Sequence, residues 1–276
     1  MTGPLASREP RAGTPPARRG FTLVELLAAV AIVGVLAAVL LPVLAGTKLS
    51  GQAASSSNNL RELAAANVAY AADHGGIFCP AQDRYNLVRW HGARTSASGA
   101  FDPTKGYLSP YLCNDGRVKI DPLFHDMITG SQSFENGTGG YGYNATYIGG
   151  TPANTYQPNR QANISRPVQT VMFTTTALAN GDGVQEYGFC EPPFWPDPSG
   201  EPAGYRPTPS VHFRFRGQAL VAWCDGHVSA EKSQKREVGD NPYGGDADTH
   251  NLGWFGPDAG NGFWNPNYDP SAQGTH

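Results

Sequence analysis

The feature that most constrains this chain is an apolar run near its N-terminus, from Phe21 to Leu41, which contains a single charged side chain, Glu25. As an α-helix these 21 residues extend about 31 Å, which matches the hydrocarbon core of a bilayer. A secretory signal peptide has a shorter apolar region that ends at a small-residue cleavage site, and no such site follows Leu41. The run therefore predicts a membrane anchor that stays with the mature protein.

The charges on either side of the run predict its orientation. The first 20 residues carry four arginines and one glutamate, whereas the rest of the chain has six more acidic than basic side chains. Because basic residues remain on the cytoplasmic side, we expect the N-terminus inside and the C-terminal region outside. The mildly acidic body has no basic stripe with interleaved aromatic residues, which argues against nucleic-acid binding.

Helical periodicity continues beyond the apolar run. From Thr47 to about Asp73 the sequence is rich in alanine, contains no proline and repeats apolar residues near a 3.6 period, so one stripe can pack on a sheet. The glycine pair that follows is typical of a helix C-terminus. We expect one helix from Phe21 to Asp73, with a bend or a melted turn near Pro42 and Gly46–Gly51, where weak helix formers gather.

The remainder reads as a loop-rich region with short strands, since glycine and proline make up about a fifth of the chain. Alternation and β-branched residues predict four strands, which are Tyr141–Ile148, Val168–Ala177, Val211–Phe215 and Ala219–Cys224. Asp225-Gly226 predicts a type I′ hairpin turn that returns through His227–Ala230. The proline-rich segment Glu186–Arg206 is expected to be a loop, and the tail from Gly239 has no regular pattern.

The six residues from Gly20 to Glu25, GFTLVE, resemble the type III signal of type IV prepilins and type II secretion pseudopilins. The shared features are a basic leader that ends in glycine, then phenylalanine, an acid at the fifth mature position and an apolar run. Pro42 also stands where this family commonly has a helix-kinking proline. The resemblance implies that prepilin peptidase cuts after Gly20 and N-methylates Phe21. Glycine suits the cut because it adopts an extended backbone without steric resistance.

The resemblance also implies a role for the carboxylate inside the apolar run. A charged side chain at the bilayer centre costs at least about 2.5–3.5 kcal/mol, so it persists only where something offsets that cost. By resemblance, Glu25 faces the N-terminal amine of a neighbouring subunit, which relieves two buried charges and sets the register between subunits. The alternative is a glutamate that snorkels to the lipid headgroups.

A looser resemblance covers part of the body. One branch of pilin-like proteins, often found in Planctomycetes and Verrucomicrobia, has a Tyr-Gly-Tyr-Asn segment, here Tyr141 to Asn144, and a C-terminal His-x9-Asp-Gly element. The segment from Trp223 to Val228 matches the end of that element. The histidine does not match, because Phe215 stands at its position and His212 lies three residues earlier.

Together these resemblances imply an α+β, pilin-like fold in which a long N-terminal helix packs on a small antiparallel sheet with long loops. The expected parts are a leader removed after residue 20, a transmembrane and assembly helix over 21–41, its periplasmic continuation over 42–74 and a globular β domain over 75–276. The implied function is a non-enzymatic subunit of a type IV pilus or a type II secretion pseudopilus. Its implied partners are other pilin or pseudopilin subunits, prepilin peptidase, an inner-membrane assembly platform and membrane lipid. It would reside in the bacterial inner membrane and in the fibre.

Two other functions compete with this one. A membrane-anchored binding protein or adhesin would use the aromatic tail, with Trp254, Phe255, Phe263, Trp264 and Tyr268, to contact a ligand such as a glycan, although these rings could equally cap the core. An anchored hydrolase would use His212, Asp225 and His227, but Asp-Gly is also favoured in turns for backbone reasons alone.

Two further sets of residues could bind or cross-link. Asp246, Asp248 and Asn251 place oxygen atoms on a glycine-flanked loop, which suits Ca²⁺, and major pseudopilins bind calcium in a C-terminal loop. The loop lacks the final glutamate of an EF-hand, so a solvated polar loop is the alternative. Four cysteines in an exported domain could form one or two disulfides or remain buried thiols; they are Cys79, Cys113, Cys190 and Cys224.

Overall fold

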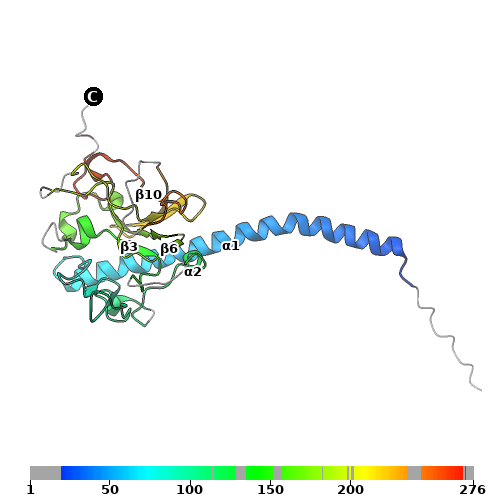
Figure 1. Ribbon diagram of the computed structural model, residues 1–276, viewed down its shortest axis with the longest axis horizontal. Helices are drawn as coiled ribbons and strands as arrows, with labels where there is room; N and C mark the ends of the chain where they lie inside the picture. The colour runs from blue at the N-terminus through cyan, green and yellow to red at the C-terminus, as the bar shows by residue number, and fades with distance from the viewer. Residues whose placement is uncertain are drawn as a thin grey trace, which may run out of the picture. The chain divides into compact units, whose positions relative to one another are not determined.

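The computed structural model describes residues 20–113, 115–128, 135–151, 157–181, 183–197, 199, 202–234, 244–269 and 271. The chain divides into two compact units, Met1–Thr47 and Lys48–His276. The helix α1, Leu23–Asp73, runs through the boundary between them (Figure 1). Its backbone is helical at Pro42 and throughout 46–51, so the melted turn expected there is absent.

The C-terminus of α1 ends in a glycine cap, as expected from the sequence. Gly75 and Gly76 have φ values of 62° and 82°, which belong to the left-handed region that glycine enters without strain. The Gly76 amide donates a 2.7 Å hydrogen bond to the Ala71 carbonyl, five residues back. This is the longer hydrogen bond of a Schellman motif, and it satisfies a carbonyl that the helix leaves open.

The second unit is built around one four-stranded antiparallel sheet in the order β3-β4-β8-β9. Its strands are β3 Tyr141–Tyr143, β4 Val171–Thr175, β8 Gln218–Trp223 and β9 Val228–Lys232. The described residues also form three two-stranded pairs, which are β1 Val88–Arg89 with β2 Gly92–Ala93, β5 Leu178–Asn180 with β6 Gly183–Gln185, and β7 Val211–His212 with β10 Leu252–Gly253. A single helical turn, α2 Pro122–His125, lies between β2 and β3 in the chain. The α+β prediction is confirmed.

The strands predicted over 168–177 and 211–215 form as the shorter β4 and β7, and two other predicted β features differ in kind. The strand expected over Tyr141–Ile148 ends at Tyr143, and Ala145–Gly149 forms a π-helical turn. Asn144 causes the change, because its side chain accepts a hydrogen bond from the Tyr147 amide and donates to the Val171 and Trp264 carbonyls.

The hairpin between β8 and β9 forms, but its turn is not type I′. Such a turn needs positive φ at both central residues, and only Gly226 of the Asp225-Gly226 pair has one, at 89°. The Gly226 amide bonds to the Trp223 carbonyl at 2.9 Å, and the Trp223 amide bonds to the His227 carbonyl at 3.0 Å. The loop therefore has three residues and ends in a left-handed glycine, as in a type I turn with a bulge.

The sheet separates two apolar clusters. Along β8, Leu220 and Ala222 join a core that contains Leu60 and Leu63 of α1, which is the helical stripe expected to pack on a sheet. The alternate residues of β8 face a second cluster, formed with the C-terminal tail residues Trp254, Phe255 and Trp264. These three rings are at most 1% exposed, so this part of the aromatic tail caps the core rather than forming an adhesive surface.

Candidate processing and assembly site

The N-terminus of α1 carries a reciprocal side-chain cap. Thr22 precedes the first helical residue, and its amide and hydroxyl donate to Glu25 Oε2 at 2.9 and 2.7 Å. The Glu25 amide in turn donates to Thr22 Oγ1 at 3.2 Å. Thr-x-x-Glu is the capping-box pattern, in which the two side chains satisfy amides that a helix start leaves unpaired.

The cap gives Glu25 a partner within its own chain, Thr22. The partners expected from the sequence were the amine of a neighbouring subunit or the lipid headgroups, whereas the Thr22-x-x-Glu25 pattern itself indicates a local one. In the structure the carboxylate is exposed and is held by its own helix start. Gly20 and Phe21 precede the helix and are also exposed, so the peptide bond between them lies outside regular structure.

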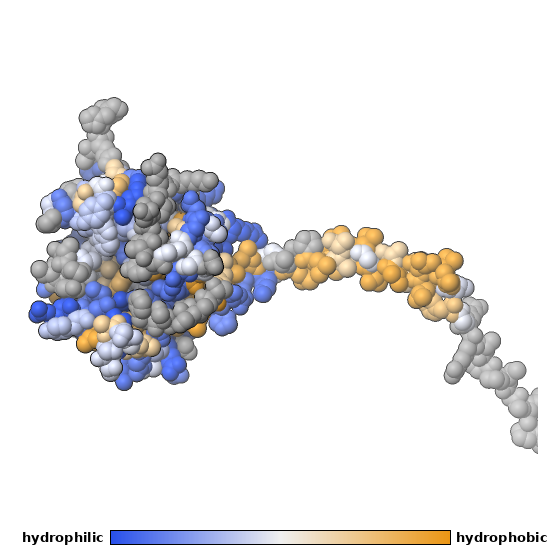
Figure 2. All heavy atoms as spheres, viewed as in Figure 1, coloured by the Kyte–Doolittle hydropathy of each residue, from blue (hydrophilic) through white to orange (hydrophobic). Residues whose placement is uncertain are grey.

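The apolar side chains of α1 in the first unit are uncovered. The large hydrophobic residues from Phe21 to Leu44 that the structure describes are 55–81% exposed (Figure 2). Exposed apolar surface of this extent is typical of a membrane or protein contact. The helix is long and apolar enough to cross a bilayer, which is consistent with a single-pass membrane anchor.

The residues of the hydrolase hypothesis are not brought together. His212 is 1% exposed. Its Nδ1 lies 3.0 Å from Arg214 Nη1, and its ring packs edge-on against Phe124. His227 lies at the exposed hairpin, where its Nδ1 is 2.6 Å from Asp225 Oδ1 and its ring stacks on Trp223. The two histidines thus have separate partners, and each has a structural role.

The loop predicted to bind calcium is described from residue 244 onward. Asp246 Oδ1 accepts the Asp248 amide at 2.9 Å, and Oδ2 accepts the Thr249 hydroxyl at 2.8 Å. Asn251 has a positive φ of 53° and closes the turn through its amide, which bonds to the Asp248 carbonyl. Over the described ranges, no three His, Cys, Asp or Glu side chains are grouped as metal ligands. Calcium binding by Asp246, Asp248 and Asn251 stays a prediction.

The four cysteines are free thiols in the structure. Cys79, Cys190 and Cys224 are buried, and Cys113 is exposed. Burial raises the pKa of all three buried thiols, because an apolar surrounding disfavours the thiolate. Disulfide bonding among these four cysteines stays a prediction.

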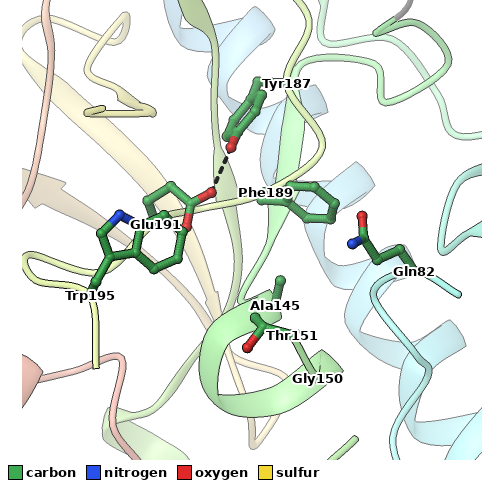
Figure 3. A pocket seen from close by; sticks show the side chains of 8 residues that line it. All are labelled: Gln82, Ala145, Gly150, Thr151, Tyr187, Phe189, Glu191 and Trp195. Carbon is green, nitrogen blue, oxygen red and sulfur yellow. Dashed lines mark hydrogen bonds between the residues drawn. The ribbon is translucent and has the colours of Figure 1, made fainter. Parts of the chain in front are cut away.

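Sequence reasoning missed one functional candidate, Glu191, which lies in the proline-rich segment expected to be a loop. Its side chain is buried and borders a cavity together with aromatic residues (Figure 3). The Tyr187 hydroxyl donates to Glu191 Oε1 at 2.6 Å. Burial raises the pKa of Glu191 to about 7, and the tyrosine bond only partly offsets this shift. The available sequence signal was an acid among closely spaced aromatic residues.

This shift predicts that Glu191→Gln stabilises the protein at neutral pH but not in acid. Glutamate in an unfolded chain has a pKa of about 4.3. Between that pH and about pH 7, Glu191 is protonated in the native state but ionised in the unfolded state. Stability of the wild-type protein therefore falls as pH rises through this window, and glutamine avoids that loss. From pH 5 to pH 8 the stability of the variant relative to wild type should rise by about 2–3 kcal/mol.

Urea unfolding of both proteins at pH 5 and pH 8 measures this difference. The exposed Asp126→Asn change is the matched control and should show little pH-dependent difference from wild type. A constant difference between Glu191→Gln and wild type at the two pH values would contradict the prediction.

Comparison with known proteins bears on the N-terminus. Residues 15–41 match the family model described as the prokaryotic N-terminal methylation motif. Comparison with curated proteins and with solved structures gives no match. The matched residues include the Gly20–Phe21 bond and Glu25, and they continue along the exposed apolar part of α1. The chain therefore carries a prepilin-type N-terminus, of the kind found in pilin and pseudopilin subunits.

Proposed function

We propose that the protein is a structural subunit of a type IV pilus or a type II secretion pseudopilus. It is made as a prepilin, cut between Gly20 and Phe21, N-methylated on Phe21 and assembled through α1. The observation that carries this proposal is the methylation motif over residues 15–41, placed on a helix whose apolar side chains are exposed. Its partners are prepilin peptidase, an inner-membrane assembly platform, membrane lipid and other subunits.

The capping box explains how the subunit could wait in the membrane. Thr22 holds the Glu25 carboxylate at the helix start, where headgroups and water are close. In the assembled fibre, the amine of a neighbouring Phe21 would replace Thr22 as the main partner of that carboxylate. This exchange replaces two neutral donors by a cation, so that two charges at the membrane neutralise each other in one pair. This contact then favours the addition of a subunit to the fibre.

The first test is the N-terminus of the mature protein. The full chain is expressed in a host with prepilin peptidase and in the same host without it, and the membrane-bound protein is analysed by intact mass and N-terminal sequencing. The expected product begins at N-methylated Phe21 and appears only when the peptidase is present. An uncut chain in both hosts, or a cut beyond Leu41, would overturn the proposal.

A further inference from the structure

A cavity of about 180 Å³ lies in the second unit. Its wall includes the aromatic rings of Tyr187, Phe189 and Trp195 (Figure 3). The polar side chains of Gln82, Thr151 and Glu191 also line it. The Tyr187 and Phe189 rings meet edge to face, with centroids 5.7 Å apart and planes at 88°. Apolar walls with a few convergent polar groups are typical of small-molecule sites.

Glu191 differs from the other buried carboxylates of the chain. Asp121 pairs with Arg214 at 3.2 Å, and Glu135 pairs with Arg89 at 2.5 Å. Glu186 accepts three hydrogen bonds, from Thr138 and Gly139. Glu191 is 5% exposed, and its carboxylate accepts one bond, from the neutral Tyr187 hydroxyl. Among the residues that the structure describes, no Lys, Arg or His forms an ion pair with it.

The surroundings of Glu191 indicate which kind of ligand the cavity fits. A buried carboxylate is stabilised by a positive charge, and aromatic faces attract cations through their quadrupole. Figure 3 shows the Glu191 carboxylate next to the Tyr187 hydroxyl, and Phe189, Trp195 and Gln82 line the same cavity. We propose that this cavity binds a small organic ammonium ion, whose charge pairs with the Glu191 carboxylate and whose alkyl groups contact the aromatic rings.

Binding of such a cation should depend on pH with a definite sign. The ligand needs an ionised carboxylate, and burial raises the pKa of Glu191 to about 7. The nearby groups that can titrate are Tyr187 and Cys190, and burial raises the pKa of the Cys190 thiol well above its usual value. The guanidinium of Arg89 lies 4.8 Å from the Phe189 ring and is engaged by Glu135. Affinity should therefore rise about tenfold per pH unit up to pH 7 and level off above it.

The test uses choline chloride and its uncharged carbon isostere, 3,3-dimethylbutan-1-ol, in calorimetric titrations of the full chain. The protein is held in a polyoxyethylene ether detergent, which contains neither an ammonium group nor a sugar. At pH 8 choline should bind at least tenfold more tightly than the isostere. Its affinity should fall by about 100-fold between pH 8 and pH 5, as the ionised fraction of Glu191 falls.

Two variants make the result specific to the cavity. Glu191→Gln keeps an acceptor for the Tyr187 hydroxyl but removes the charge, and it should abolish the preference for choline. Asp126→Asn removes an exposed charge elsewhere and should leave the preference unchanged. Equal binding of choline and the isostere, or no binding of choline at pH 8, would each overturn the proposal. These outcomes do not depend on processing at Gly20, so they are separate from the test of the proposed function.

Discussion

Replacing Asp121 by alanine is expected to lower the free energy of unfolding by about 3–5 kcal/mol, because it leaves a buried arginine without its counter-ion. Both side chains of the Asp121–Arg214 pair are fully buried. Arg214 Nη2 donates to Asp121 Oδ2 at 3.2 Å and to the Gly140 carbonyl at 2.6 Å. Without the carboxylate, the guanidinium charge remains in an apolar interior with only neutral acceptors.

The same carboxylate links three parts of the second unit. Its Oδ1 accepts the Leu123 and Phe124 amides and so caps α2. Its Oδ2 also accepts the Ser56 hydroxyl at 2.5 Å, which ties α1 to the segment that precedes α2. Ser56 is in turn 3.1 Å from the Tyr141 hydroxyl on β3. Loss of Asp121 therefore also removes a helix cap, which is worth about 1 kcal/mol, and weakens the contact between α1 and the sheet.

Urea denaturation of the full chain, followed by tryptophan fluorescence, measures the effect. Asp126→Ala removes a carboxylate from an exposed pair with His125 and should change stability by less than about 1 kcal/mol. Asp121→Asn keeps the shape and the cap acceptor but not the charge, so it should fall between the two. If Asp121→Ala were as mild as Asp126→Ala, the buried network would not hold α1 to the sheet.

Replacing Glu25 by alanine is expected to abolish filament assembly while the protein accumulates in the membrane. Removing a carboxylate from the apolar run should not hinder insertion, because a charged side chain is costly inside the bilayer. Under the proposed function, the same change removes the partner of the neighbouring N-terminal amine and leaves that amine unpaired in each subunit contact. The anchored protein should therefore increase or stay constant as the fibre disappears. Immunoblots of sheared fibres and of membranes from the same cells measure both quantities.

Thr22→Val is the matched control, because Thr22 is the local partner of Glu25. Valine keeps the shape of threonine but removes the hydroxyl that caps the helix, at a cost of about 1 kcal/mol, and Glu25 keeps its charge. Assembly should persist in Thr22→Val. Fibres in Glu25→Ala at the wild-type level would refute the inter-subunit pairing. Equal loss in both variants would instead assign the defect to the helix cap.

The features of this protein that its sequence determined are local ones. The N-terminal motif, the helix through Asp73 and its glycine cap could all be predicted, because hydrophobic periodicity, capping and glycine conformation depend on neighbouring residues. The hairpin at Asp225-Gly226 was predicted for the same reason. Its turn type was not, because the strand pairing that extends to Trp223 and His227 decided the length of the loop.

Only the tertiary structure decided which distant side chains meet. Asp121 and Arg214 lie 93 residues apart, and no sequence spacing indicates that they form one buried pair. Glu191 stood in a segment that reads as a loop, yet the fold buries it beside Gln82 and Trp195 at the edge of a cavity. The sequence allowed the tail aromatic residues to lie on the surface or in the core. In the fold they pack against the second face of the sheet. Burial and charge pairing depend on which segments pack against each other, and in this protein those segments are far apart along the chain.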